Sequence, residues 1–273
     1  MGDLERVDGL EIKVRPFEDA TPFLSQPERL QAMAERDGFV YLRKLVPDEA
    51  ILALRAVVLD YAREASWLDP AAPPDEPRAF PGKRVGGYQE DEWVNLQVRV
   101  QNKAEMWAVG DHIEIHRALR AVSGRSSYLC LSTANTCRVF SPHPDMATQP
   151  HQDAHYFRLI EDFWTVWMPL GDCPREDGAL ALLAGSHHGG LRDHTGLGIV
   201  DGGVVVPEDT VWTSGDFSCG DAVLFRPHTL HRSLPNRSET RLRLSADFRY
   251  GFWDDTSPID WRSRSVGLHD GSV

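Results

Sequence analysis

The sequence has few cysteines and no long hydrophobic run. Its four cysteines (Cys130, Cys137, Cys173 and Cys219) form no Cys-x-x-Cys pair, so we expect reduced, buried thiols rather than a disulfide framework. No apolar stretch approaches the roughly 18 residues that a membrane-spanning helix needs. The first residues, Met1 to Arg6, are acidic and lack the apolar run of a signal peptide. These absences predict a soluble protein of the cytoplasm.

Positive charge is also scarce. Lys and Arg number 29 against 41 Asp and Glu, a net charge of -12, which argues against nucleic acid or an anionic membrane as the main partner. The chain contains no Walker loop, Rossmann glycine fingerprint or Gly-x-Ser-x-Gly elbow, and this excludes the common nucleotide-binding and hydrolase classes. Hydrophobic residues still make up 41% of the chain, enough for a sizeable core. We therefore expect a globular protein.

The two halves of the sequence carry different patterns. Up to residue 124 we predict helices over 31–36, from Pro47 onward and over 112–122, strands over 39–42 and 93–100, and a Pro- and Gly-rich loop over 69–87 that resembles a lid. Short strands then dominate, at 128–131, 136–140, 163–170, 179–183, 204–206, 222–225 and 242–250. The sequence therefore predicts a mainly β barrel or sandwich with flanking helices (α+β). We expect one domain over 1–273, with helical support at about 27–123, a β core at about 128–250 and a tail at 251–273.

Two His-x-Asp pairs offer metal ligands of mixed type. Two His and one carboxylate on one face of a metal form the facial triad of non-haem Fe(II) oxygenases. A His-x-Asp pair alone is weak evidence, because about one is expected by chance in this chain. His143-Pro144-Asp145 lies among loop residues, whereas His151-Gln152-Asp153 is soon followed by the apolar strand predicted from residue 163. The pattern favours the second pair.

The third ligand has two candidates. Gly220-Asp221 forms a turn that leads into the strand at 222–225, and Pro227 ends the regular pairing of that strand. His228 and His231 follow directly, and either side chain could face the interior of a barrel. The pattern leaves both open.

Alternating polar residues come next along the chain. Arg241, Arg243, Ser245 and Asp247 alternate with apolar residues, so a strand would put all four polar side chains on one face. An amphipathic strand with a solvated face has the same pattern. If the face instead points inward beside a metal, a guanidinium there can bind a carboxylate through two hydrogen bonds and keep its charge. This interpretation suits a dicarboxylate cosubstrate.

Together these residues resemble the phytanoyl-CoA dioxygenase family of Fe(II)/2-oxoglutarate-dependent oxygenases. The ordered set of motifs is far more specific than any one of its members. Ala184 departs from the family pattern, which usually has Pro before Gly-Ser-His, and no dedicated coenzyme A site is visible. The matching segments, spread over about residues 30–250, are Asp37–Leu42 with Pro47–Glu49, His151–Phe157, Val166–Leu170, Asp177–Leu180, Gly185–His187, Gly220–His231 and Asn236–Ser245.

The resemblance implies a double-stranded β-helix core of the jelly-roll, cupin-like kind, with three iron ligands: His151, Asp153 and His231. It favours His231 over His228 because the ligand in the family precedes a short polar turn ending in Asn, as at Asn236. Arg241 best matches the family's arginine for the distal carboxylate of 2-oxoglutarate, with Arg243 as the alternative. The other cofactor-binding positions that the resemblance implies are Ser245, Trp167, Gln97 and Arg99.

The resemblance also implies a reaction. It predicts a dioxygenase that uses Fe(II), the cosubstrate 2-oxoglutarate and dioxygen to hydroxylate a small organic metabolite, with release of succinate and CO2. The carboxylate of Asp153 fits an oxygenase, because halogenating relatives have a small residue in its place. Two alternatives remain: a cupin-like metal enzyme without redox chemistry, and a non-catalytic module that binds a small molecule.

Overall fold

Two β-sheets face each other in the computed structural model, which describes residues 3–7, 10–86, 91–126, 128–131, 134–143, 147–157, 162–196 and 202–252. One sheet has the order β3 (Phe39–Leu42), β9 (Ala222–Phe225), β6 (Phe163–Pro169), β11 (Arg243–Phe252), β4 (Tyr128–Cys130), and β5 (Thr136–Phe140) also pairs with β11. The other has the order β1 (Asp3–Val7), β2 (Leu10–Arg15), β8 (Val211–Thr213), β7 (Leu180–Leu182), β10 (His231–Ser233). We call them the β11 sheet and the β10 sheet.

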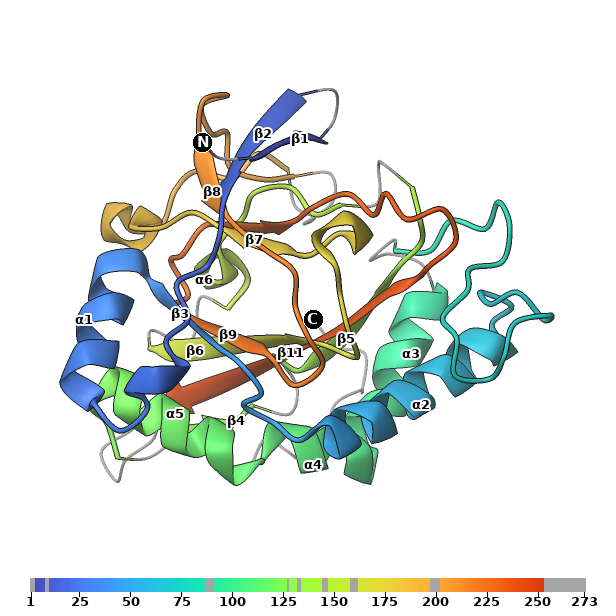
Figure 1. The fold of residues 1–273 in the computed structure, drawn as a ribbon, viewed down its shortest axis with the longest axis horizontal. Coiled ribbons are helices and arrows are strands. Elements are labelled where there is room, and N and C mark those ends of the chain that lie inside the picture. Colours follow the sequence, from blue (N-terminus) through green and yellow to red (C-terminus); the bar gives the residue numbers. More distant parts are fainter. Residues whose placement is uncertain are drawn as a thin grey trace, which may run out of the picture.

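Helices cover the outer face of the β11 sheet (Figure 1). They are α1 (Pro27–Asp37), α2 (Asp48–Glu64), α3 (Asp91–Gln101), α4 (Ala104–Gly110) and α5 (Ile113–Ser123), while the four-residue α6 (Asp153–Tyr156) lies apart from them. Short 3-10 turns occur at Thr21–Phe23, Arg175–Asp177 and Ser186–Gly189. Gly38 caps the end of α1, and its φ of 84° is a left-handed conformation that glycine adopts at little cost. No helix in the described ranges is long and apolar enough to span a membrane.

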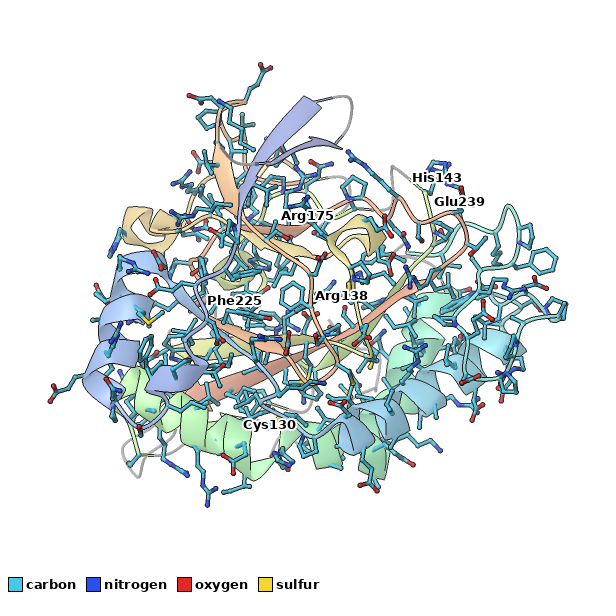
Figure 2. The ribbon with its side chains drawn as sticks, viewed as in Figure 1. Cys130, Arg138, His143, Arg175, Phe225 and Glu239 are labelled. Carbon is cyan, nitrogen blue, oxygen red and sulfur yellow. The ribbon has the colours of Figure 1, made fainter. Side chains whose placement is uncertain are left out.

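The period of two along β11 divides the interior into two layers. Its even-numbered residues, Leu244 to Tyr250, pack with the helices in the larger apolar core. Its odd-numbered residues from Arg243 to Arg249 face the other way. All of them are polar, yet they are also buried. Beside them, between the sheets, lies a smaller apolar cluster that includes Trp167 and Phe225. Arg138 and Phe225 lie in the middle of the molecule and Glu239 at its edge (Figure 2).

The predicted fold class is confirmed: a β core of two facing sheets with flanking helices. The strands expected at 39–42, 136–140 and 222–225 have these same bounds, and those expected at 163–170 and 242–250 differ by one or two residues at their ends. The predicted division of one domain into three parts stays a prediction, since the tail is described only at 251–252.

The strand predicted over 93–100 is wrong, because this segment belongs to helix α3. Asp91 and Glu92 occupy its first turn, where acidic side chains oppose the helix dipole favourably. Leu96 and Val100 are spaced by one helical turn and both are fully buried. The alternation of polar residues in this segment had indicated a strand. Its apolar residues instead follow the helical period, and they are the ones that pack into the core.

Several short strands were placed wrongly or missed. Residues 204–206 form no strand, while β1, β2, β8 and β10 were not predicted. β8 and β10 have three residues each and are defined by pairing with β2 and β7 rather than by any run of their own. Segments of this length carry too little periodicity to be recognised locally.

Candidate metal centre

A backbone bridge brings two histidines together. His151 and His231 are 80 positions apart in the sequence, yet each donates its N–H to the carbonyl of the other, at 2.9 and 3.0 Å. Side chains of directly opposed residues lie on the same side of a bridge, and the two ring centroids are 4.2 Å apart. Both side chains are buried, at 3% and 5% exposure.

Each imidazole is held in one tautomer. The Nδ1 of His151 lies 2.7 Å from the carbonyl of Gln149, and the Nδ1 of His231 lies 3.0 Å from the carbonyl of Thr229. A carbonyl oxygen can only accept, so each Nδ1 carries the proton and each Nε2 keeps a lone pair. This arrangement is the usual one for histidines that bind a metal through Nε2.

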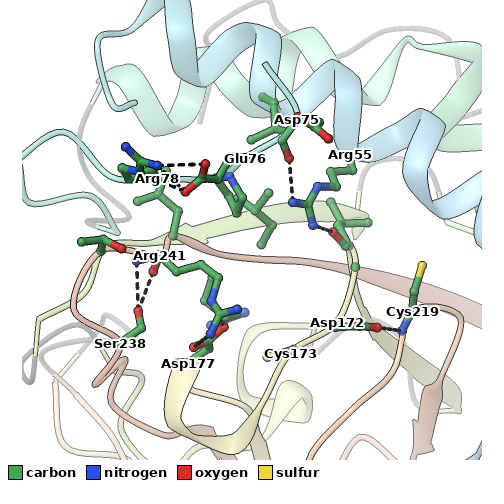
Figure 3. A pocket seen from close by; sticks show the side chains of 18 of the residues that line it. Arg55, Asp75, Glu76, Arg78, Asp172, Cys173, Asp177, Cys219, Ser238 and Arg241 are labelled. Atoms are coloured by element: carbon green, nitrogen blue, oxygen red, sulfur yellow. Dashed lines mark hydrogen bonds and ion pairs between the residues drawn. The ribbon is translucent and has the colours of Figure 1, made fainter. Parts of the chain in front are cut away.

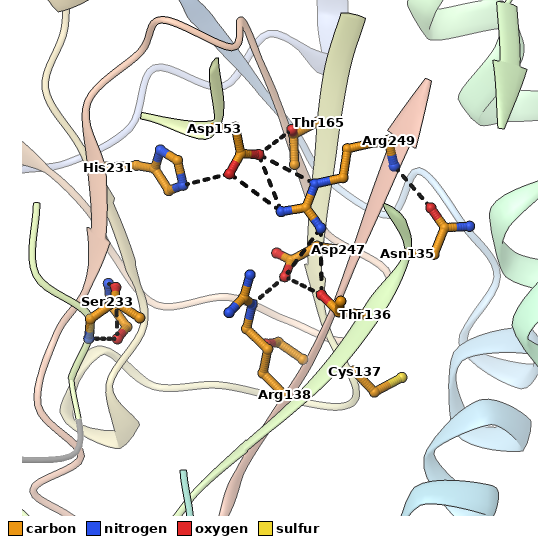
Figure 4. Close-up of polar contacts among 12 residues, drawn as sticks. Asn135, Thr136, Cys137, Arg138, Asp153, Thr165, His231, Ser233, Asp247 and Arg249 are labelled. Atoms are coloured by element: carbon orange, nitrogen blue, oxygen red, sulfur yellow. Dashed lines mark hydrogen bonds and ion pairs between the residues drawn. The ribbon is translucent and has the colours of Figure 1, made fainter. Parts of the chain in front are cut away.

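A carboxylate completes the group. Asp153 is the first residue of α6 and is 2% exposed. Its Oδ1 lies 3.7 Å from the Nε2 of His231, and Figure 4 shows the carboxylate beside that ring. One ligand atom from each of His151, Asp153 and His231 lies within 4.8 Å of the others. Two imidazole nitrogens and one carboxylate oxygen in this arrangement fit a divalent metal with open positions.

The charges of the three groups also suit a cation. Burial lowers the pKa of His151 well below its ordinary value, and the neighbouring His231 lowers it further. Burial also lowers the pKa of His231, although Asp153 opposes the shift. For Asp153, burial raises the pKa, but the charge of Arg249 and the two imidazoles outweigh it, so the net shift is downward. At neutral pH the site therefore offers two neutral imidazoles and one carboxylate.

A buried network of alternating charge surrounds the carboxylate (Figure 4). Arg249 on β11 pairs with Asp153 at 3.2 Å, and its other side lies 3.9 Å from Asp247. Asp247 pairs in turn with Arg138 of β5 and accepts a hydrogen bond from Thr136 at 3.0 Å. The two arginines outweigh the burial of Asp247, so its pKa is also lowered.

The buried guanidinium of Arg243 has no acidic partner among the residues that the structure describes. Arg243, at the start of β11, is 3% exposed, donates to the hydroxyl of Ser245 and stacks 4.3 Å above the ring of Phe140. Within the described part of the chain, its Nε has no hydrogen-bond partner. Burial lowers its pKa to about 10. A guanidinium in this setting can accept a carboxylate from a ligand.

Arg241 lies elsewhere. Its side chain is 43% exposed, and its Nε lies 2.7 Å from Asp177. It lines a cavity of about 1520 Å³ between α2, the segment 73–78 and the turn 237–241 (Figure 3). That cavity borders the loop predicted as a lid and reaches Arg243, but none of the three clustered ligands lines it. The structure therefore brings Arg243, rather than Arg241, into the interior.

The remaining predicted cofactor residues occupy three different places. Trp167 is buried between the sheets and packs edge-on against Phe217, with ring centroids 4.8 Å apart. The side-chain amide of Gln97 links α3 to β5, because it donates a hydrogen bond to the carbonyl of Cys137 at 2.8 Å and accepts one from its N–H at 2.9 Å. Arg99 pairs with Glu64 on the outer surface. Neither Gln97 nor Arg99 is brought to the triad, a consequence of α3 being a helix.

The structure describes some of the other candidate metal ligands. His228 is not in the cluster, and its carbonyl accepts a hydrogen bond from Gln152 at 2.7 Å. In the other His-x-Asp pair, Pro144 and Asp145 lie outside the described residues. A surface group of Glu35, His187 and His188 has a similar composition, but Arg226 pairs with Glu35 at 3.1 Å and brings a competing positive charge.

Half-exposed rings extend from the triad along α6. The ring centroid of Tyr156 lies 6.0 Å from that of His151, and the ring of His155 stacks on His194 at 3.9 Å. The side chain of Gln152 fixes the segment that carries His194, because it donates to Gly190 at 2.8 Å and accepts from the backbone of residue 192 at 2.8 Å. We call Tyr156, His155 and His194 the ring row.

Sequence reasoning missed Arg249 and Thr165, which hold Asp153. The signal was available for Arg249, because it continues the alternation of Arg243, Ser245 and Asp247 by one step. No sequence signal singles out Thr165 from its apolar strand, since its position beside Asp153 depends on how β6 packs.

Comparisons with known proteins identify the family of the chain. The chain matches the family model described as phytanoyl-CoA dioxygenase (PhyH) over residues 34–244. It is 27% identical over 255 residues to a 1-deoxypentalenic acid 11-beta-hydroxylase of Streptomyces arenae, covering 85% of this chain and 84% of the relative. A protein of the same name from Streptomyces exfoliatus is 26% identical over 249 residues, with the same coverage.

Solved structures show the same fold. The non-haem alpha-ketoglutarate-dependent carbocyclase SnoK aligns with a TM-score of 0.57 at 17% identity, over 82% of this chain and 83% of that one. The epimerase SnoN, solved with Fe3+, alpha-ketoglutarate and nogalamycin RO, aligns with a TM-score of 0.55 at 19% identity, over 83% and 84%. Their different reactions show that this fold alone does not fix the outcome of the oxidation.

Proposed function

Because the chain belongs to the phytanoyl-CoA dioxygenase family, we propose that it is an Fe(II)- and 2-oxoglutarate-dependent dioxygenase that hydroxylates a small organic molecule. The observation that carries the proposal is the buried convergence of His151, Asp153 and His231. When bound there, Fe(II) with 2-oxoglutarate and dioxygen supplies the oxidation of a C–H bond to an alcohol, with release of succinate and CO2.

The three clustered residues would hold the metal on one face. The Nε2 lone pairs of His151 and His231 point away from the backbone carbonyls that fix their Nδ1 protons. Asp153 contributes the negative charge. All three side chains are nearly excluded from solvent.

Arg243 is the residue we propose for the distal carboxylate of 2-oxoglutarate. It is a buried cation that has, among the described residues, neither a partner for its Nε nor an acidic partner, so a carboxylate would relieve the cost of burying its charge. Ser245 already accepts a hydrogen bond from Arg243 and lies on the same face of β11. Arg241 already has Asp177. Trp167 stays a candidate for packing against the cosubstrate.

The substrate would approach from the ring row. Tyr156 and His155 are half-buried, whereas the three residues before Ala154 in the chain are buried, so the rings form the more open side of the site. Flat aromatic surfaces favour a substrate with a compact hydrocarbon body. The Streptomyces relatives are named for hydroxylation of a carboxylic acid, and 1-deoxypentalenic acid is the first compound to test. We also propose a cytoplasmic location, because all four cysteines are free thiols and thiols stay reduced in that compartment.

Anaerobic addition of Fe(II) and then 2-oxoglutarate tests the proposal. Chelation of the metal by the keto acid is expected to give a weak visible charge-transfer band. His151→Ala and His231→Ala, which each remove one ligand, should lose the band, while His228→Ala should keep it. An unchanged spectrum in the wild-type protein would contradict the proposal and favour a cupin-like enzyme without redox chemistry.

A further inference from the structure

The two oxygens of the Asp153 carboxylate have different surroundings. Oδ2 accepts a hydrogen bond from the Thr165 hydroxyl at 2.6 Å and from the Nε and Nη2 of Arg249 at 3.3 and 3.2 Å. Oδ1 has one longer contact, with the Nη2 of Arg249 at 3.4 Å, and faces the Nε2 of His231. Three donors converge on one oxygen, which leaves the other as the oxygen that faces the imidazoles.

The residues that grip Oδ2 are a cross-strand pair. Thr165 on β6 and Arg249 on β11 lie directly opposite each other in the antiparallel register. Opposed residues point to the same face of a sheet, so the two donors reach one oxygen from neighbouring strands. A shift of the register by one residue would turn either side chain to the opposite face, toward the helices. The strand pairing therefore sets the orientation of the carboxylate.

The guanidinium of Arg249 is itself immobilised. Its Nη1 donates to the carbonyl of Ala134 at 2.9 Å, and its backbone N–H donates to the side chain of Asn135 at 3.0 Å. The ring of Phe157 lies 5.2 Å from the guanidinium carbon. Because Arg138 pairs with Asp247, the main partner of Arg249 is Asp153. Arg249 is 2% exposed, so water does not compete for its donors.

We propose that Arg249 and Thr165 are positioning residues that occupy Oδ2 of Asp153 and present Oδ1 alone to the metal. A carboxylate held in this way would bind a metal through one oxygen and use one coordination position. If both oxygens were free to turn toward the metal, the carboxylate could take two positions and occupy one that the cosubstrate or dioxygen needs. The inference rests on the proposed metal centre but concerns how its carboxylate ligand is oriented.

Cobalt(II) is a suitable probe because its visible d–d absorption reports the number and geometry of ligands without turnover. Arg249→Met keeps the length of the side chain and removes its donors, and Thr165→Val keeps the shape and removes the hydroxyl. Loss of a partner of a metal ligand typically weakens metal binding about 10- to 100-fold. We expect that loss for Arg249→Met and a loss of at least about threefold for Thr165→Val, each with an altered d–d band.

Two control variants separate orientation from general destabilisation. Thr165→Ser keeps the hydroxyl and should restore the wild-type affinity and band. Tyr250→Phe removes a buried hydrogen bond of 2.6 Å to Gly110 from the opposite face of β11, so it should lower stability and leave the cobalt spectrum unchanged.

The outcomes are separable. If the wild-type protein and both Asp153-gripping variants, Arg249→Met and Thr165→Val, bind cobalt(II) with the same affinity and spectrum, the positioning role is overturned while the metal centre stands. If Arg249→Met does not fold, Thr165→Val against Thr165→Ser decides the question alone. Failure of the wild-type protein to bind cobalt(II) would overturn the metal centre and this inference with it.

Discussion

At the scale of single residues, the interior of this protein is organised by buried arginines with unequal partners. Arg249 has Asp153, and Arg138 has Asp247. Arg243 has only a hydroxyl and an aromatic ring among the described residues. Because an unpaired buried cation is costly, the 3% exposure of Arg243 supports the proposal that a ligand anion binds there.

Substitution of Arg243 should therefore weaken the cosubstrate rather than the metal. We expect Arg243→Gln to raise the Kd for 2-oxoglutarate about 30-fold or more, since removing a charged hydrogen-bonding partner costs about 2–5 kcal/mol. Arg241→Gln is the matched control, two residues away on the exposed side, and should change that Kd less than about twofold. Isothermal titration with Fe(II) under anaerobic conditions measures both. The reverse ranking would restore Arg241 as the anchor.

The two buried imidazoles should make the metal-free protein sensitive to acid. Their pKa values are lowered in the folded state, whereas in the unfolded chain they return to about 6.5. As the pH falls through that value, the unfolded chain binds protons that the folded chain does not, so the free energy of unfolding decreases. The limiting slope is about 1.4 kcal/mol per pH unit for each imidazole.

Urea unfolding of the metal-free protein between pH 7.5 and 5.5 measures this slope. The double variant His151→Asn, His231→Asn keeps every other titrating group and should lose this part of the dependence. Equal slopes for the two proteins would show that His151 and His231 are already protonated in the folded state, or that they titrate alike in both states.

At the scale of elements, β11 is the strand on which both halves of the site depend. One face supplies Arg243, Ser245, Asp247 and Arg249 to the interior, and the other packs Phe248 and its neighbours against the helices. Its pairing with β6 places Arg249 opposite Thr165. A single strand register thus aligns the proposed anchor of 2-oxoglutarate with the grip on the metal carboxylate.

Helix α3 supports the sheet rather than the site, and Gln97 makes this testable. The side-chain amide of Gln97 hydrogen-bonds both the N–H and the carbonyl of Cys137 on β5. Gln97→Met leaves both backbone groups unpaired, so we expect a loss of about 1–3 kcal/mol in the free energy of unfolding for each of them, with an unchanged Kd for 2-oxoglutarate. Arg99→Gln, which breaks an exposed pair with Glu64, should cost less than about 1 kcal/mol. A weakened Kd in Gln97→Met would revive its role in cofactor binding.

At the scale of the whole molecule, the proposed metal would connect the two sheets. His231 belongs to the β10 sheet, and Asp153 is held by Thr165 and Arg249 of the β11 sheet. A ligand that binds only the folded state adds RT ln(1 + [L]/Kd) to stability. Bound metal should therefore oppose separation of the layers.

Addition of cobalt(II) at about 100 times its Kd should raise the free energy of unfolding by about 2.7 kcal/mol. Urea titration with and without the metal measures the gain. His231→Ala, which removes the ligand from the β10 sheet, should show less than a third of it, while His188→Ala, in the exposed group with Glu35, should show all of it. An equal gain in His231→Ala would place the bound metal elsewhere.

Local sequence indicated which residue types could bind a metal and where they lie in the chain. The His-x-Asp spacing and the alternation of Arg241, Arg243, Ser245 and Asp247 are readable because each depends on a few neighbouring residues and on the period of a strand. The choice of His231 over His228 came from the family resemblance, because the local pattern left both open. The facing-sheet core with flanking helices was predictable for the same reason.

Only the tertiary structure decided which arginine faces inward and what holds Asp153. β11 begins at Arg243, and before it the chain bridges to residue 78, so Arg241 turns toward Asp177 instead. The grip of Thr165 and Arg249 arises from a register between strands about 80 residues apart in the sequence. Local patterns do not encode these pairings, because they are fixed by the packing of the whole core, which also made residues 93–100 helical.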